Sequence, residues 1–143
     1  MQNELQGSWV LVNPYLDDDP MQKQGQLGLI TDLDLDNDDV YVSFSKGEQG
    51  LYSTAVLLVL KPPAEIYKIA LVYRDDMDAA DFKDLLHITA QQDINSRGGI
   101  RNALEIAMKN EMLRACSLVS IRDSLRIAPE LAPELEAAPV RGR

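Results

Sequence analysis

The chain has 143 residues, of which 45% are hydrophobic and 26% are charged, a composition typical of one compact globular domain or two small ones. No apolar run approaches the roughly 20 residues that a membrane-spanning helix needs, and the N-terminus lacks the basic start and apolar core of a signal peptide. One cysteine cannot form a disulfide within the chain, so we expect a cytoplasmic protein without membrane association.

The formal net charge of −9 is concentrated in the first 60 residues. This part holds ten acidic residues and two lysines, whereas residues 61–127 hold ten residues of each sign. Such a field repels phosphate backbones and attracts cations or basic protein surfaces. We therefore expect a protein partner with a basic surface, and the charge argues against nucleic acid.

Short apolar runs separated by turn residues predict five strands in the first 60 residues, at 8–12, 26–33, 40–45, 51–53 and 57–60. The third run, VYVSFS, alternates most clearly. Val40, Val42 and Phe44 point to one face, and Tyr41 points to the other. Gly28 in the second run indicates a bulge or a close backbone contact, as a strongly bent strand needs.

Two consecutive prolines, Pro62 and Pro63, end the predicted sheet and begin a helical part. Apolar residues at helical spacing predict a helix over 64–74, although this stretch also reads as a strand. Further helices are expected over 78–94, 100–109 and 111–127, with Asp78 as an N-cap and Asn110 as a break. From Ala128 onward, three prolines and a doubled Pro-Glu-Leu predict a disordered tail.

The order of these parts resembles the SH3-like barrels of the KOW, Tudor-like and Mib/Herc2 kind. The resemblance rests on Trp9 in the first strand, on a long acidic loop and on three spaced motifs: Gly25-x-x-Gly-x-Ile30, Val40-Tyr-Val-x-Phe44 and Gly47-x-x-Gly-Leu-Tyr52. It covers about the first 60 residues and implies that residues 6–61 form a five-stranded antiparallel SH3-like barrel, so that with the helices predicted above we expect an α+β protein. Three or four helices in a subdomain at 62–127 pack on this barrel, and a disordered tail follows at 128–143. It also implies a binding module for peptide, protein or RNA.

The tyrosines of the barrel, together with its acidic loops, form the candidate binding face. In SH3-like barrels an exposed aromatic patch beside acidic loops suits a basic or proline-containing peptide. The alternative is that these rings pack against the helices. The candidate residues are Tyr15, Asp17, Asp18, Asp19, Asp34, Asp36, Tyr41 and Tyr52.

The alternating aspartates from Asp32 to Asp38 begin like a calcium-binding loop, but the match then fails. Counting from Asp32, the sixth position is Asn37 rather than glycine, and the twelfth is Ser43 rather than glutamate. We expect a solvated turn that keeps an edge from pairing, with no metal ligands assigned. Weak binding of a divalent cation is the alternative.

No arrangement of residues typical of a catalytic site stands out. His87 has neither a second histidine nor an acidic residue four positions ahead, and Cys116 lies on an apolar helical face. Arg97 and Arg101 at the start of the third helix could hold an anion, but a plain connecting loop is the simpler interpretation.

We therefore expect a non-enzymatic interaction or adaptor module, with no cofactor, whose acidic barrel face binds a basic protein or peptide. One alternative is a nucleic-acid-associated factor of the KOW kind. A divalent-cation-binding structural protein is the other.

Overall fold

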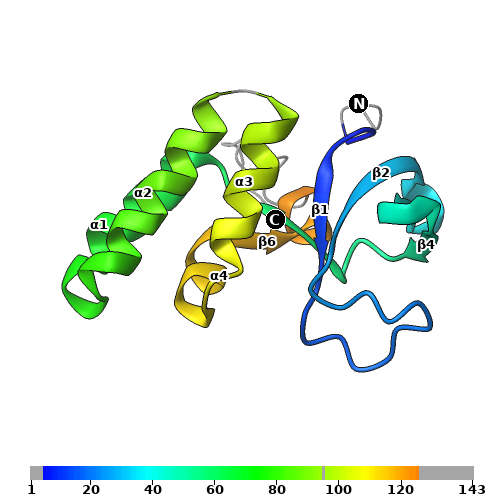
Figure 1. Ribbon diagram of the computed structural model, residues 1–143, viewed down its shortest axis with the longest axis horizontal. Helices are drawn as coiled ribbons and strands as arrows, with labels where there is room; N and C mark the ends of the chain where they lie inside the picture. Colours follow the sequence, from blue (N-terminus) through cyan, green and yellow to red (C-terminus); the bar gives the residue numbers. More distant parts are fainter. Residues whose placement is uncertain (1–4, 95, 126–143) are drawn as a thin grey trace, which may run out of the picture.

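The computed structural model describes residues 5–94 and 96–125 and shows a mixed α+β fold (Figure 1). A curved antiparallel sheet of six strands lies beside a group of helices. The strand order in the sheet is β4-β3-β2-β1-β5-β6. The strands are β1 (Trp9–Val12), β2 (Leu27–Asp34), β3 (Asp39–Ser43), β4 (Gln49–Tyr52), β5 (Leu57–Leu60) and β6 (Leu118–Ser120).

Strand β1 is central because both of its faces are buried. Successive side chains of a strand point to opposite faces. Val10 and Val12 enter the core enclosed by the curved sheet, and Leu11 enters a second core between the sheet and the helices. All three side chains are fully buried, so the run WVLV holds the two cores together. Truncating Leu11 to alanine would cost about 2–5 kcal/mol of stability.

The core enclosed by the sheet consists mainly of β-branched and aromatic residues, most of which alternate along the strands. The predicted assignment of side chains to the two faces of strand β3 is confirmed, since Val40, Val42 and Phe44 are buried and Tyr41 is exposed. The close backbone contact predicted at Gly28 is confirmed as well, because a Cβ at this position would lie 3.0 Å from the carbonyl oxygen of Ser43.

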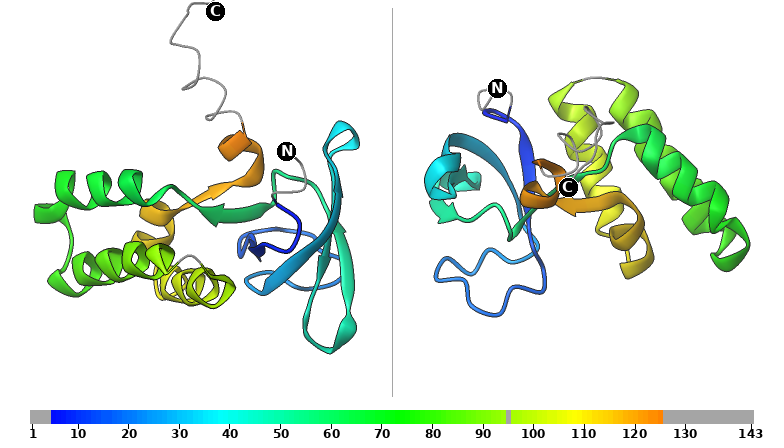
Figure 2. Two further views of the ribbon diagram at one scale, coloured as in Figure 1. Left: turned by 90° about the horizontal axis from the view of Figure 1, so that it is seen from above. Right: turned by 180° about the vertical axis from the view of Figure 1, so that it is seen from behind.

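Four α-helices lie between strands β5 and β6 in the chain, and the prediction of a helix directly after Pro63 is confirmed. Side chains cap two of them: Ser96 accepts from the N–H of Gly99, and Asn110 accepts from that of Leu113. Figure 2 shows the α1–α2 hairpin extending away from the sheet. The helices are α1 (Pro63–Val72), α2 (Ala79–Asp93), α3 (Arg97–Ala107) and α4 (Glu111–Ser117), a helical segment covers residues 121–125, and short 3₁₀ turns form η2 (Leu35–Asn37), η3 (Ser45–Gly47) and η4 (Arg74–Asp76).

The predicted continuous helix over 111–127 is wrong, because strand β6 interrupts it. Strand β6 pairs with β5, and Leu118 and Val119 lie opposite Leu60 and Val59. The hydrophobic spacing that suggested a helix runs on past Ser117, but the free edge of β5 offers backbone partners that a local pattern cannot reveal. Pairing with this edge therefore overrides the helical periodicity.

Strand β6 also changes the description of the sheet. The sheet has six strands, and the two strands at its ends, β4 and β6, are not paired with each other in the part of the chain that the structure describes. The predicted five-stranded closed barrel is therefore not confirmed, and the described sheet is open. The predicted tail at 128–143 and the last two residues of the predicted helical subdomain lie outside the described residues.

Candidate functional site on the outer face of the sheet

The outer face of the sheet, which points away from the enclosed core, carries two rows of side chains that cross neighbouring strands. In one row Trp9 of β1 lies opposite Leu29 of β2, which lies opposite Ser43 of β3 and then Gln49 of β4. The second row crosses strand β3 at Tyr41, two residues before Ser43, and it is shorter. It consists of Asp32, Tyr41 and Leu51.

A β-bulge between Ile30 and Asp32 creates the second row. Regular alternation would place Asp32 on the same side as the buried Ile30. The extra residue of the bulge turns Asp32 outward, where it is exposed, and turns Leu33 inward against the sheet core. The bulge thus places a carboxylate beside the ring of Tyr41, which is 38% exposed, and Tyr41 lies beside Leu51, which is 54% exposed.

The turn between β2 and β3 extends this acidic end of the outer face. Asp34 and Asp36 are exposed, and the carboxylate of Asp34 accepts a hydrogen bond from the amide of Asn37. Asp38 has a structural role, since it accepts hydrogen bonds from the N–H and hydroxyl of Thr54 and from the Arg122 guanidinium. The bonds from Thr54, followed by Arg122, hold the pKa of Asp38 below its usual value.

No metal site is evident at this turn. Across residues 5–94 and 96–125, no three side chains of histidine, cysteine, aspartate or glutamate come together in a way that could hold a metal ion. Asp38 is already engaged with Thr54 and Arg122, so it is not a free ligand.

Tyr52 and Asp19, two of the predicted binding residues, are buried and lie inside the fold. The Tyr52 hydroxyl donates a 2.9 Å hydrogen bond to Asp19, whose carboxylate also accepts from the N–H groups of Met21 and Lys23. Tyr52 is 7% exposed and its ring packs edge-on against Phe44. The expectation that Tyr52 presents its ring on the surface must be corrected, because its position along β4 points it into the core. Burial, followed by the Asp19 bond, raises the pKa of Tyr52.

The other residues predicted in the β1–β2 loop lie apart from the acidic turn. Tyr15 is 60% exposed and belongs to a contact with helix α4, where its hydroxyl donates to Glu111 and accepts from Arg114. Asp17 and Asp18 are exposed, and an ion pair between Lys23 and Glu48 holds their loop beside the β3–β4 hairpin. These contacts join Tyr15 to helix α4 and Lys23 to the β3–β4 hairpin, and neither of them involves Asp34 or Asp36.

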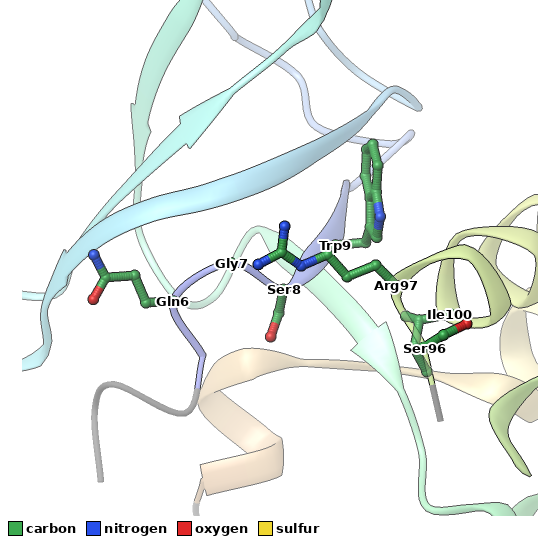
Figure 3. Close-up of a pocket in the computed structure, with 7 residues that line it drawn as sticks. All are labelled: Gln6, Gly7, Ser8, Trp9, Ser96, Arg97 and Ile100. Atoms are coloured by element: carbon green, nitrogen blue, oxygen red, sulfur yellow. The ribbon is translucent and has the colours of Figure 1, made fainter. Parts of the chain in front are cut away.

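Trp9 lies in the neighbouring row of the outer face, where α3 meets the sheet, and the sequence did not identify it as a site residue. A hollow of about 300 Å³ separates the N-terminal segment from the first turn of α3, as Figure 3 shows. A second hollow of about 420 Å³ lies over strands β2 and β3, and Trp9 lines both. We call this surface the Trp9 groove; its lining residues include Ser8, Trp9, Leu29, Ser43, Arg97 and Arg101.

The Trp9 groove is basic in a strongly acidic chain. The guanidinium carbon of Arg101 lies 5.3 Å from the centre of the Trp9 ring, within the range of a cation–π contact. The guanidinium of Arg97 extends over Gly7 (Figure 3), where a Cβ would lie only 3.1 Å from it. Trp9 and the arginines are about 90 residues apart in sequence, so no local motif could have revealed this group.

The two remaining side chains with reactive potential match their structural interpretation. Cys116 is buried, and burial raises the pKa of its thiol, which disfavours the nucleophilic thiolate. His87 is exposed on helix α2.

No protein-family model, curated protein or solved structure matches the chain. Among the described residues, no helix is both long and apolar enough to cross a membrane. The function must therefore be argued from the outer face itself.

Proposed function

We propose that the protein is a non-enzymatic interaction module that binds a basic segment of a partner protein on the acidic end of its outer face. One observation supports this most: the row Asp32, Tyr41 and Leu51 places an exposed ring between a carboxylate and an exposed leucine on three neighbouring strands. Lysine and arginine side chains combine an apolar stem with a cationic head, so such a row suits both parts.

The surroundings of this row favour the same kind of partner. Asp34 and Asp36 add exposed negative charge next to it, and the first 60 residues carry a net charge of −8. Strand β4 is an edge strand whose outer backbone groups are available for an added strand. A basic peptide in extended form could therefore combine backbone pairing with charge complementarity.

We also propose that residues 6–61 are an SH3-like barrel module. Support comes from the consecutive order β4-β3-β2-β1-β5 within the sheet and from the core that these strands enclose. Barrels of this kind carry many unrelated functions, so the fold by itself does not select the partner.

A lysine-rich peptide of about ten residues with a fluorescent label is a direct probe of this proposal. We expect saturable binding that weakens with added salt, because the contacts are exposed and screened. Replacing Asp32, Asp34 and Asp36 together by asparagine should weaken binding by roughly three- to tenfold, in line with the modest worth of exposed ion pairs. Tyr41→Ala should weaken it as well.

The matched control is Asp93→Asn, which removes one exposed carboxylate at the end of α2. This variant should bind the peptide like the natural protein. Equal affinity in the triple variant, or binding that is indifferent to salt, would refute the proposal.

A nucleic-acid-associated function is the second candidate, and the Trp9 groove is the observation that favours it. Aromatic rings flanked by arginines are used to bind single-stranded nucleic acids. The net charge of −9 opposes a polyanionic ligand, however, so we rank this function below protein binding.

A further inference from the structure

We propose that the Trp9 groove is a second binding site, for an extended acidic segment of a partner protein whose carboxylates pair with Arg97 and Arg101. This site occupies the row of the outer face next to Asp32 and Tyr41, and it has the opposite charge. The inference goes beyond the proposed function and does not depend on it, since each site has its own residues.

The two arginines are arranged to act together. They are four residues apart in helix α3, so they project from the same face, about one helical turn from each other. Stacking on the Trp9 ring restrains Arg101, whose only acidic contact among the described residues is Glu105, at 3.7 Å and largely exposed. Arg97 makes no ion pair with any residue of the described part of the chain. Both guanidinium groups therefore retain N–H donors for a carboxylate.

The shape of the groove favours an extended chain over a small anion. Trp9 lines both hollows, and their lining residues extend from the N-terminal segment to the end of strand β3. Leu29 and Ile100 supply apolar lining, while Ser43 supplies a hydroxyl group. A segment that alternates carboxylates with compact apolar residues such as proline would match this lining, because aromatic grooves accept proline in extended peptides.

The charge of the whole chain favours a peptide over a nucleic acid. A nucleic acid places a negative charge on every nucleotide, and the acidic end of the same face would repel it along its length. A short peptide with two or three carboxylates can place them at the arginines and keep neutral residues elsewhere. The groove therefore fits an acidic peptide better than it fits a polyanion.

Trp9 is the only tryptophan of the chain, so its fluorescence reports directly on the groove. The probe is a synthetic decapeptide of alternating glutamate and proline, added to the full-length protein. We expect a saturable change of the tryptophan emission and reduced quenching by acrylamide. Replacing both arginines, as Arg97→Gln with Arg101→Gln, should weaken binding by roughly tenfold. Both side chains are exposed, so the variant should fold, and its circular dichroism and thermal midpoint verify this.

Two controls make the result specific. Lys83→Gln removes an exposed cation from helix α2 and should leave the binding curve unchanged. A decapeptide of alternating glutamine and proline should bind at least about tenfold more weakly than the glutamate peptide, because it lacks the charge.

Four outcomes would overturn the inference. They are the absence of any saturable change, equal binding of the glutamine peptide, unchanged binding by the double arginine variant, and tighter binding of a ten-nucleotide deoxythymidine oligomer. A fifth test concerns the chain itself: if replacing Glu130, Glu134 and Glu136 by glutamine changes the Trp9 emission of the free protein, the occupant is the chain's own C-terminal segment rather than a partner.

Discussion

The phenol of Tyr52 donates a 2.9 Å hydrogen bond to the carboxylate of Asp19, across 33 residues of sequence. Asp19 is 5% exposed and Tyr52 is 7% exposed, so the pair attaches the long β1–β2 loop to the inner face of strand β4. Two residues that the sequence suggested for binding instead hold the loop in place. A buried carboxylate tolerates burial only when hydrogen bonds satisfy it.

Tyr52→Phe should destabilise the protein by about 1–3 kcal/mol, because the buried Asp19 then loses one of its donors. Urea unfolding followed by circular dichroism measures this change in the free energy of unfolding. Tyr67→Phe is the matched control, since this ring is 50% exposed on helix α1, and its effect should lie within about 0.5 kcal/mol of zero. Equal effects of the two substitutions would show that the Tyr52 bond is not stabilising.

Stability should fall on acidification. Burial raises the pKa of Asp19, but the N–H groups of Lys23 and Met21 and the Tyr52 hydroxyl outweigh it, so the folded pKa lies below the ordinary 3.8. The hydrogen bonds from Thr54 likewise lower the pKa of Asp38 in the folded protein. A group with a lowered folded pKa contributes stability that is present above its unfolded pKa and is lost as the pH falls through its folded pKa.

The thermal midpoint should therefore hold at pH 5 and decrease progressively as the pH falls below about 3.8, the unfolded value. Calorimetry at pH 6, 4 and 3 measures this dependence. The Asp19→Asn variant should have a lower thermal midpoint at pH 6. Its midpoint should also decrease less between pH 6 and pH 3, because one carboxyl group whose titration is coupled to folding has been removed. If this variant loses as much stability between pH 6 and pH 3 as the natural protein, Asp19 is not a linked group.

Asp38→Ala should cost about 2–3 kcal/mol for two physical reasons. Asp38 accepts hydrogen bonds from Thr54 and Arg122, and its φ of 58° is in the left-handed region, where alanine is strained. Asp38→Asn should cost less, since asparagine tolerates this conformation and keeps an acceptor for Thr54. Chemical denaturation ranks the variants. Asp36→Ala, at an exposed position of the same turn, should be close to neutral, and a cost similar to that of Asp38→Ala would contradict this assignment.

Gly28→Ala and Gly98→Ala should change stability in opposite directions. A Cβ at Gly28 would lie 2.4 Å from Val42 and 3.0 Å from the carbonyl oxygen of Ser43, which predicts a cost of about 1–3 kcal/mol. At Gly98, in the first turn of α3, a Cβ would lie at an ordinary 3.9 Å from Oγ of Ser96, so alanine should stabilise by up to about 1 kcal/mol.

A double variant tests the cause of the Gly28 effect. Val42→Ala removes the atom closest to the added methyl group, so the cost of Gly28→Ala should be smaller in that background. Strictly additive costs in thermal unfolding would mean that Val42 is not the source of the strain.

Local patterns predicted the elements whose structure depends on near neighbours in sequence. The alternation in VYVSFS correctly predicted the buried and exposed sides of strand β3, and the two prolines marked the start of α1. Strand β6 was missed because Leu118 to Ser120 pair with β5, nearly 60 residues away, and a helical spacing runs through them. Of the residues that the sequence suggested for binding, Tyr41, Asp34 and Asp36 are exposed, whereas Tyr52 and Asp19 are buried.

The sequence by itself determined the α+β class, the first five strand runs, helices α1 to α3 and the acidic character of the first 60 residues. These follow from residue composition and periodicity, which act over a few residues. The tertiary structure decided which side chains share a surface. The bulge that turns Asp32 outward, the contact that buries Tyr52 with Asp19, and the stacking of Arg101 on Trp9 each join residues through strand register or helix packing. Such contacts depend on long-range pairing, and residue spacing along the chain does not encode them.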